Sequence, residues 1–258
     1  MSGLGRRRQA GAGVPANAEQ ILAEARKALL VMFGFVALVW AVQLANWGGD
    51  YALSRHHGIV PGDAGTLPDV FVSSFLHWNW AHIEANSGPL FVFGFLAAYR
   101  GVARFLGLSV LVMVTSGLME WVFGDGGNRT VGASGLVYGF FAYVVVRGLF
   151  DRHLIDTLIG VVMAASYAYI LTTAVPGTPG ISWLGHLGGL IGGVTGAWLF
   201  RDRARGGAGA RSGSRARDGA GTRDRAGKPT RGPALPATRP TDNPRAALYK
   251  ELDDLGLL

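Results

Sequence analysis

The sequence predicts an all-α membrane protein, a bundle of six transmembrane helices flanked by polar extensions. Two observations lead to this prediction. The 258-residue chain is 49% hydrophobic with a mean hydropathy of +0.27, and its apolar residues are concentrated before residue 201. This block is too apolar for a soluble core of its size and is typical of a polytopic membrane protein. The chain contains no cysteine, which excludes disulfides, thiolate catalysis and cysteine-based metal sites.

The two extensions are the parts that cannot bury a core. Residues 1–26 are rich in Gly and Ala, and they are predicted to form a mostly disordered arm, with a short helix from Ala18 as an option. Most of the net charge of +7 lies in residues 201–258, which are rich in Arg, Gly, Ala and Pro and are predicted to be a disordered basic tail. Residues 27–200 are expected to form the membrane domain.

The membrane domain contains apolar runs of the length that a bilayer requires, about 20 residues each. Helices are expected over residues 28–47, 80–99, 105–123, 134–150, 158–174 and 183–200. The first run is long enough to span, so we expect it to remain as a helix rather than be removed as a signal peptide. The loop over residues 48–76 has too many Gly and Pro breakers to span, and we expect it to lie in the outer interface.

The distribution of basic residues predicts the orientation. Arg and Lys fall in the N-terminal arm, between the second and third helices, between the fourth and fifth, and in the tail. The positive-inside rule then places both termini in the cytoplasm. As a consequence, four polar residues of the second, fourth and sixth helices share one depth near the outer surface. They are His82, Asn86, Ser134 and His186.

Ser134 and His186 form a candidate catalytic pair. Ser134 begins an apolar helix between small residues, and a serine hydroxyl needs a base to become a nucleophile. His186 lies at the same predicted depth, and imidazole titrates near neutrality. Ionisable residues at membrane depth are functional candidates by default. The pair viewed alone leaves open a second interpretation, that these are two unrelated polar residues.

Glycines predict that the two helices come close. Gly135 and Gly139 lie four apart, and the last helix carries the interleaved rows 185-189-193 and 188-192-196. Such rows allow backbone contact between membrane helices, whatever the function. Tyr138, one turn after Ser134, is placed to pack on the imidazole.

Acyl transfer also requires donors for an oxyanion. His82 and Asn86 are four residues apart and share a helix face. They are interpreted as hydrogen-bond donors to an oxyanion, although an Asn can also form a hydrogen bond that joins two membrane helices. The acidic residues do not complete a triad: Asp125 lies in a glycine-rich loop, and Glu84 and Glu120 are interpreted as interfacial. A Ser-His dyad is therefore the simplest mechanism.

Three motifs resemble those of the rhomboid family of intramembrane serine proteases. GASG at Gly132–Gly135 with Tyr138 is similar to the nucleophile motif. His186 followed by Gly189 and Gly193 is similar to the last-helix pattern. LHWNWAHIEAN at Leu76–Asn86 is similar to the second-helix signature. The resemblance covers about residues 27–200.

The resemblance implies roles for these residues. Ser134 would be the nucleophile, His186 the general base and acid, and His82 and Asn86 the oxyanion-hole side chains. The supporting residues are then Tyr138, Gly132, Gly135, His77, Gly189 and Gly193, with His77 organising the loop before the second helix. No metal or organic cofactor is implied. Many members have a Trp-Arg pair in the first loop where this chain has Pro68 and Asp69, so the anchoring of that loop must differ.

The expected function is that of an endopeptidase that cleaves single-span membrane proteins near the outer face of a bacterial plasma membrane. One alternative is a catalytically silent relative that binds membrane helices. Another is an anchor whose basic tail contacts anionic lipid headgroups or nucleic acid. A specific nucleic-acid partner is not expected, because the tail has no aromatic interleaving and no recognised fold.

Overall fold

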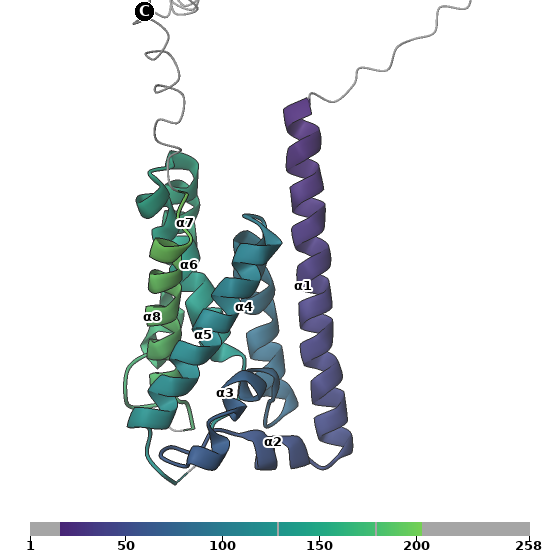
Figure 1. Cartoon of the computed structure of the whole chain (residues 1–258), viewed down its shortest axis with the longest axis vertical. Helices are drawn as coiled ribbons and strands as arrows, with labels where there is room; N and C mark the ends of the chain where they lie inside the picture. The colour runs from purple at the N-terminus through teal and green to yellow at the C-terminus, as the bar shows by residue number, and fades with distance from the viewer. Residues whose placement is uncertain (1–15, 128, 179, 203–258) are drawn as a thin grey trace, which may run out of the picture. The chain divides into compact units, whose positions relative to one another are not determined.

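The computed structural model describes residues 16–127, 129–178 and 180–202, which are folded almost entirely into helices (Figure 1). All six predicted helices are present, in the predicted order. They are α1 (Ala16–Gly48), α4 (Trp80–Ala98), α5 (Val102–Phe123), α6 (Ser134–Asp151), α7 (Leu154–Tyr167) and α8 (Trp183–Leu199). The predictions for the first part of the arm, residues 1–15, and for the basic tail, residues 203–258, lie outside the described residues.

The prediction was wrong about the start of the first helix. The α1 helix has 33 residues, which corresponds to about 50 Å at 1.5 Å per residue. This exceeds the roughly 30 Å of a hydrocarbon core. The Ala, Glu, Gln and Leu residues before Lys27 are strong helix formers, and no breaker separates them from the apolar run. The part of the arm over 16–26 is therefore helical and continuous with the span.

Helix α7 also differs from the prediction. It begins at Leu154 instead of residue 158, and its last turn tightens into a 3₁₀ segment, η3 (Ala168–Thr173). Helix α5 begins at Val102, three residues earlier than predicted. The starts of α4 and α8 agree with the prediction because each has a side-chain cap. Such a cap stabilises a helix by about 1 kcal/mol.

The loop between α1 and α4 is more ordered than its glycines and prolines suggested. It contains four short helices, α2 (Ala52–His57), η1 (Ala64–Thr66), α3 (Asp69–Val72) and η2 (Ser73–Phe75). Buried Asn46, near the end of α1, donates from Nδ2 to Ser54 Oγ (2.8 Å) and to the His77 carbonyl oxygen (3.0 Å). Val70 of α3 packs on α5 so closely that a Cβ on Gly117 would lie 2.6 Å from it. The loop is thereby fastened to two helices.

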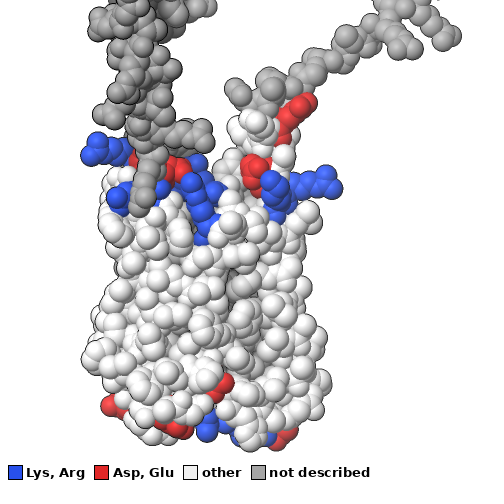
Figure 2. Space-filling model, viewed as in Figure 1, with Lys and Arg blue, Asp and Glu red and all other residues white. Residues whose placement is uncertain are grey.

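The helices have the features of a membrane bundle. Among the described residues, four segments are long and apolar enough to cross a bilayer: Ala18–Gly48, Val102–Phe123, Ser134–Asp151 and Leu154–Thr173. Figure 2 shows that charged side chains gather at the two ends of the bundle and leave an uncharged band between them. The apolar band matches the requirement that charge stays out of the hydrocarbon region.

Helices α6 and α8 are in backbone contact through their glycines. A Cβ placed on Gly189 would lie 2.3 Å from the Gly135 carbonyl oxygen, and one on Gly193 would lie 2.0 Å from that of Gly139. Because 135 faces 189 and 139 faces 193, the two helices run parallel. Ser134 and His186 thus lie at the same end of this contact.

The contact between α6 and α8 predicts that adding a single methyl group at Gly189 has a large effect. Gly189→Ala should push α6 and α8 apart as rigid bodies, since neither backbone can yield locally without breaking its helix. A shift of approximately 1 Å should lower the endopeptidase activity expected from the sequence about 10²-fold. Gly88→Ala is the matched control, because nothing lies within 4 Å of a Cβ at Gly88. Assays of this expected activity with both purified variants provide the measurement. Equal activity of Gly189→Ala and wild type would contradict the close approach.

Candidate active site

Ser134 is the first residue of α6 and follows a turn that only glycine accommodates. Gly132 has φ +142°, and a Cβ there would lie 2.8 Å from the His82 ring. Its N–H donates to the Ser73 carbonyl oxygen (2.9 Å), and the next N–H, that of Ala133, donates to His77 Nε2 (3.3 Å). The Ser134 N–H occupies the first helical turn, where no intrahelical acceptor is available.

The loop after α1 fixes the segment that leads into Ser134. Ile59 and Thr130 form an isolated antiparallel bridge, with N–H···O distances of 3.0 and 2.9 Å. Arg129 Nη1 adds a hydrogen bond to the Gly58 carbonyl oxygen (3.1 Å). The turn before Ser134 is thus held by backbone groups of a distant segment, a role that no pattern of residue types reveals.

Asp69, one of the two residues at the Trp-Arg positions, makes a contact within this loop. Asp69 Oδ1 lies 3.0 Å from His57 Nδ1, which connects α3 to α2. His77 is fully buried, and its burial together with nearby His82 lowers the pKa of His77 to about 3. His77 is therefore neutral at neutral pH, which allows Nε2 to accept the Ala133 N–H.

His186 is held on two sides. Its imidazole stacks on the Tyr138 ring, with centroids 4.1 Å apart and planes at 9°. Its Nδ1 lies 2.8 Å from the Thr173 carbonyl oxygen. A carbonyl can only accept, so Nδ1 must donate, and in neutral imidazole Nε2 is then the acceptor. Within the described residues no hydrogen bond joins Ser134 to His186, so Nε2 remains available.

Tyr138 connects the same segment to α6. Its hydroxyl donates to the Ile170 carbonyl oxygen and also contacts Thr173 Oγ1. Helix α7 is otherwise exposed along most of its length, because only 6% of the residues in the apolar stretch within Leu154–Thr173 are buried. The end of α7 is therefore held by the two aromatic rings that flank the candidate site.

His82 lies on α4 beside the turn before Ser134, and Asn86 follows one turn later on the same helix. A Cβ on Gly132 would lie 2.9 Å from His82 Nε2 and 3.7 Å from Ser134 Oγ, so these two side chains share one space. Asn86 is 8% exposed, and its Nδ2 has no hydrogen-bond partner in the described part of the chain. A buried amide without an acceptor is costly. The arrangement therefore suits an oxygen that arrives with a substrate.

The three acidic residues near the site differ in their burial. Glu84 and Asp125 are exposed, and neither contacts His186. Glu120, interpreted from the sequence as interfacial, is 7% exposed, and its carboxylate accepts from Thr130 and Ser182. The reason is that loops on both sides fold over the end of α5. One sequence signal could have indicated this, since Ser116 and Glu120 share a face of an apolar helix.

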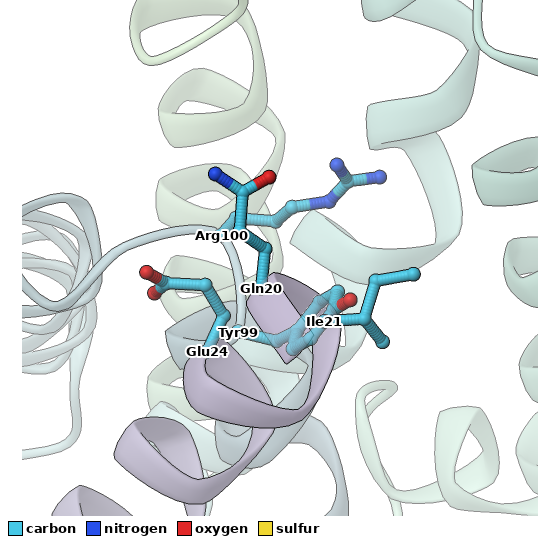
Figure 3. A pocket seen from close by; sticks show the side chains of 5 residues that line it. All are labelled: Gln20, Ile21, Glu24, Tyr99 and Arg100. Atoms are coloured by element: carbon cyan, nitrogen blue, oxygen red, sulfur yellow. The ribbon is translucent and has the colours of Figure 1, made fainter. Parts of the chain in front are cut away.

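A cavity of about 290 Å³ lies elsewhere, between the first turns of α1 and the end of α4. Figure 3 shows its lining residues, Gln20, Ile21, Glu24, Tyr99 and Arg100. Arg100 also pairs with Asp156 of α7. This cavity is at the opposite end of α4 from His82 and has no part in the candidate site. Among the described residues, no group of three or more His, Cys, Asp or Glu is arranged to hold a metal ion.

Comparisons with known proteins agree with this architecture. A family model described as the rhomboid domain matches residues 64–203. An uncharacterized protein of Mycobacterium tuberculosis is 38% identical over 173 residues, which is 64% of this chain and 72% of that protein. One of Mycobacterium leprae is 35% identical over 177 residues, 64% of this chain and 68% of the relative. A chloroplastic rhomboid-like protein of Arabidopsis thaliana is 31% identical over 140 residues, 49% of this chain and 50% of that protein.

Proposed function

The chain belongs to the rhomboid family, and on this premise we propose that it is an intramembrane serine endopeptidase with a Ser134–His186 dyad. One observation carries the proposal. The Thr173 carbonyl oxygen fixes Nδ1 of His186 as the protonated nitrogen, while Tyr138, one turn after Ser134, stacks on the ring. The imidazole is thereby held in the tautomer that a general base requires, without a carboxylate.

In the proposed reaction Ser134 Oγ attacks the scissile carbonyl carbon, and His186 Nε2 takes the hydroxyl proton. The proton then passes to the leaving amine, which departs and leaves an acyl-serine. Water, deprotonated by the same nitrogen, hydrolyses this ester and regenerates both side chains. Catalytic hydrogen bonds in ligand-free enzymes are often long, so the absence of a Ser134–His186 bond in the described structure is compatible with this mechanism.

The oxyanion would be stabilised by three donors of different origin. They are the N–H of Ser134 at the start of α6, the His82 ring and Asn86 Nδ2. The α6 N-terminus contributes a favourable dipole. The Asn86 amide is supported by its burial without a partner. Such preorganised donors lose nothing to reorganisation when the charge develops.

Asn86→Ala should lower kcat about 10²-fold and leave KM nearly unchanged, because the lost hydrogen bond forms only in the transition state. Steady-state cleavage of a single-span substrate gives both constants. Gly88→Ala, two positions later, is a control for changes in α4, because nothing lies within 4 Å of a Cβ there. A rise in KM with kcat unchanged would instead assign Asn86 to substrate binding.

The orientation follows from the charges. Lys and Arg gather at the end where α1 begins and α8 ends (Figure 2); they are Arg26, Lys27, Arg100, Arg104, Arg147, Arg152 and Arg201. By the positive-inside rule we assign this end to the cytoplasm of a bacterium and the site to the outer face. Single-span membrane proteins would enter beside α7, the least buried helix. The basic tail would be accessory and contact anionic lipid.

A fluorophosphonate probe tests the proposal directly. Wild-type protein should be labelled, because the probe reacts with an activated serine, and Ser134→Ala should not be labelled. Ser166→Ala, an exposed serine of α7, should label like wild type. Labelling read by in-gel fluorescence and located by mass spectrometry gives the result. An unlabelled wild type would favour a catalytically silent protein that binds membrane helices.

A further inference from the structure

Glu120 occupies an unusual position for an acidic residue. It lies in the last turn of α5, is 7% exposed, and uses both carboxylate oxygens. Thr130 Oγ1 donates to Oε1 at 2.7 Å, and Ser182 Oγ donates to Oε2. Burying an acidic side chain at such a place costs free energy unless the carboxylate is fully hydrogen-bonded. Ionisable residues that are found there are candidates for a functional role.

The two partners of Glu120 lead to the two members of the dyad. Thr130 lies four residues before Ser134, in the segment bridged to Ile59. Ser182 is the N-cap of α8, four residues before His186, and its carbonyl oxygen accepts the His186 N–H at 3.4 Å. One carboxylate therefore connects the entry to the nucleophile helix with the entry to the base helix.

The direction of the hydrogen bonds explains why a carboxylate suits this position best. Ser182 Oγ accepts the Gly185 N–H at 3.0 Å, so its hydroxyl proton is available for Glu120. Thr130 also donates its proton. A carboxylate offers two acceptor oxygens and needs no donor of its own. It is the group that can receive both hydroxyls at once.

Helix α5 reinforces this link one turn earlier. Ser116, on the same face as Glu120, donates to the Gly185 carbonyl oxygen at 2.7 Å. The first turn of α8 is thus fastened to α5 at two levels. A role for Glu120 as a third triad member does not fit, because Nδ1 of His186 is already bound to the Thr173 carbonyl oxygen.

We propose that Glu120 is a positioning residue, which sets the distance between Ser134 and His186 by joining Thr130 to Ser182. This proposal rests on the proposed protease function and adds a positioning residue to its site. Glu120 contacts neither the substrate nor the reacting atoms. Its removal should leave the two helices folded but allow their starts to move independently.

Kinetics of three variants test the proposal. Glu120→Ala should lower kcat about 10²-fold with KM within about threefold of wild type, the result expected when the reacting groups are misplaced by roughly 1 Å. The kcat of Glu120→Gln should be at least about tenfold higher than that of Glu120→Ala. The Gln amide oxygen can still accept a hydrogen bond from one of the two hydroxyl groups, while its N–H donates to the oxygen of the other hydroxyl. Glu84→Ala removes an exposed acid of α4 and should behave like wild type.

A double-mutant cycle of Thr130 and Glu120 gives a second test of the positioning role. Thr130→Val removes the hydroxyl with little change of shape, and in the Glu120→Ala background it should have no further effect on kcat, because the hydrogen bond is already lost. If the losses in kcat caused by Thr130→Val and Glu120→Ala multiply in the double variant, the positioning role is refuted. Equal activities of Glu120→Ala and Glu120→Gln would also refute it. So would a kcat of Glu120→Ala within threefold of wild type.

Amide hydrogen exchange separates this proposal from the protease proposal. Glu120→Ala should speed exchange in peptides that cover 129–136 and 181–187 and leave the inner half of α6 unchanged. This outcome supports the link even if wild-type protein fails to cleave or to react with the probe, in which case only the protease proposal fails. Unchanged exchange in both peptides would overturn the link itself.

Discussion

Replacing Ser134 with alanine is expected to abolish cleavage of a single-span model substrate reconstituted in liposomes. The variant keeps α6, because alanine is a strong helix former and Ser134 has no side-chain hydrogen bond among the described residues. It loses the only oxygen proposed to attack the carbonyl. The kcat for cleavage should fall by at least about 10⁴-fold, a loss of the size found when the nucleophile is removed from a serine protease in which nucleophile and base act together.

Gel-based cleavage assays with purified protein measure the Ser134→Ala effect, and Ser166→Ala is the control for loss of a hydroxyl. The thermal unfolding midpoint of Ser134→Ala should stay close to that of wild type. Substantial cleavage by Ser134→Ala would exclude the serine mechanism.

His186→Ala should reduce cleavage to a similar extent. The imidazole supplies the base, and without it the Ser134 hydroxyl keeps its proton. Because nucleophile and base act as one unit, the double variant Ser134→Ala/His186→Ala should be no slower than either single variant. Probe labelling of His186→Ala should also be lost, in contrast to Asn86→Ala, whose serine remains activated.

The control for His186→Ala is His56→Ala, which alters an exposed histidine of α2. Cleavage and labelling are measured on the same preparations, so that folding and activity are compared directly. If His186→Ala retains labelling at the wild-type rate, another group must activate Ser134, and the dyad proposal fails.

The order and type of the helices could be predicted because hydrophobicity and helix breakers are local properties. Six apolar runs bounded by glycines, prolines and charges became six helices, and glycine rows four residues apart became the contact of α6 with α8. The boundaries of α1 and α7 could not be predicted in the same way. Hydropathy marks where a helix enters the membrane, whereas the helix itself continues until its backbone hydrogen bonds end.

The residues of the candidate site were also recognisable, because serine, histidine and asparagine are uncommon in apolar helices. Their chemical state was not. The tautomer of His186 depends on a backbone carbonyl at Thr173, and every residue type carries such a carbonyl.

Glu120 shows the same distinction. The sequence identified an acid near a helix end, and such a position normally indicates an interface. Only the tertiary structure brings Thr130 and Ser182 to its two oxygens from segments ten and 62 residues away. The local sequence thus specified which helices form and which polar residues they carry. The packing of distant loops decided which of these groups are buried, what they bind and which proton each one holds, because burial and hydrogen bonding depend on neighbours in space.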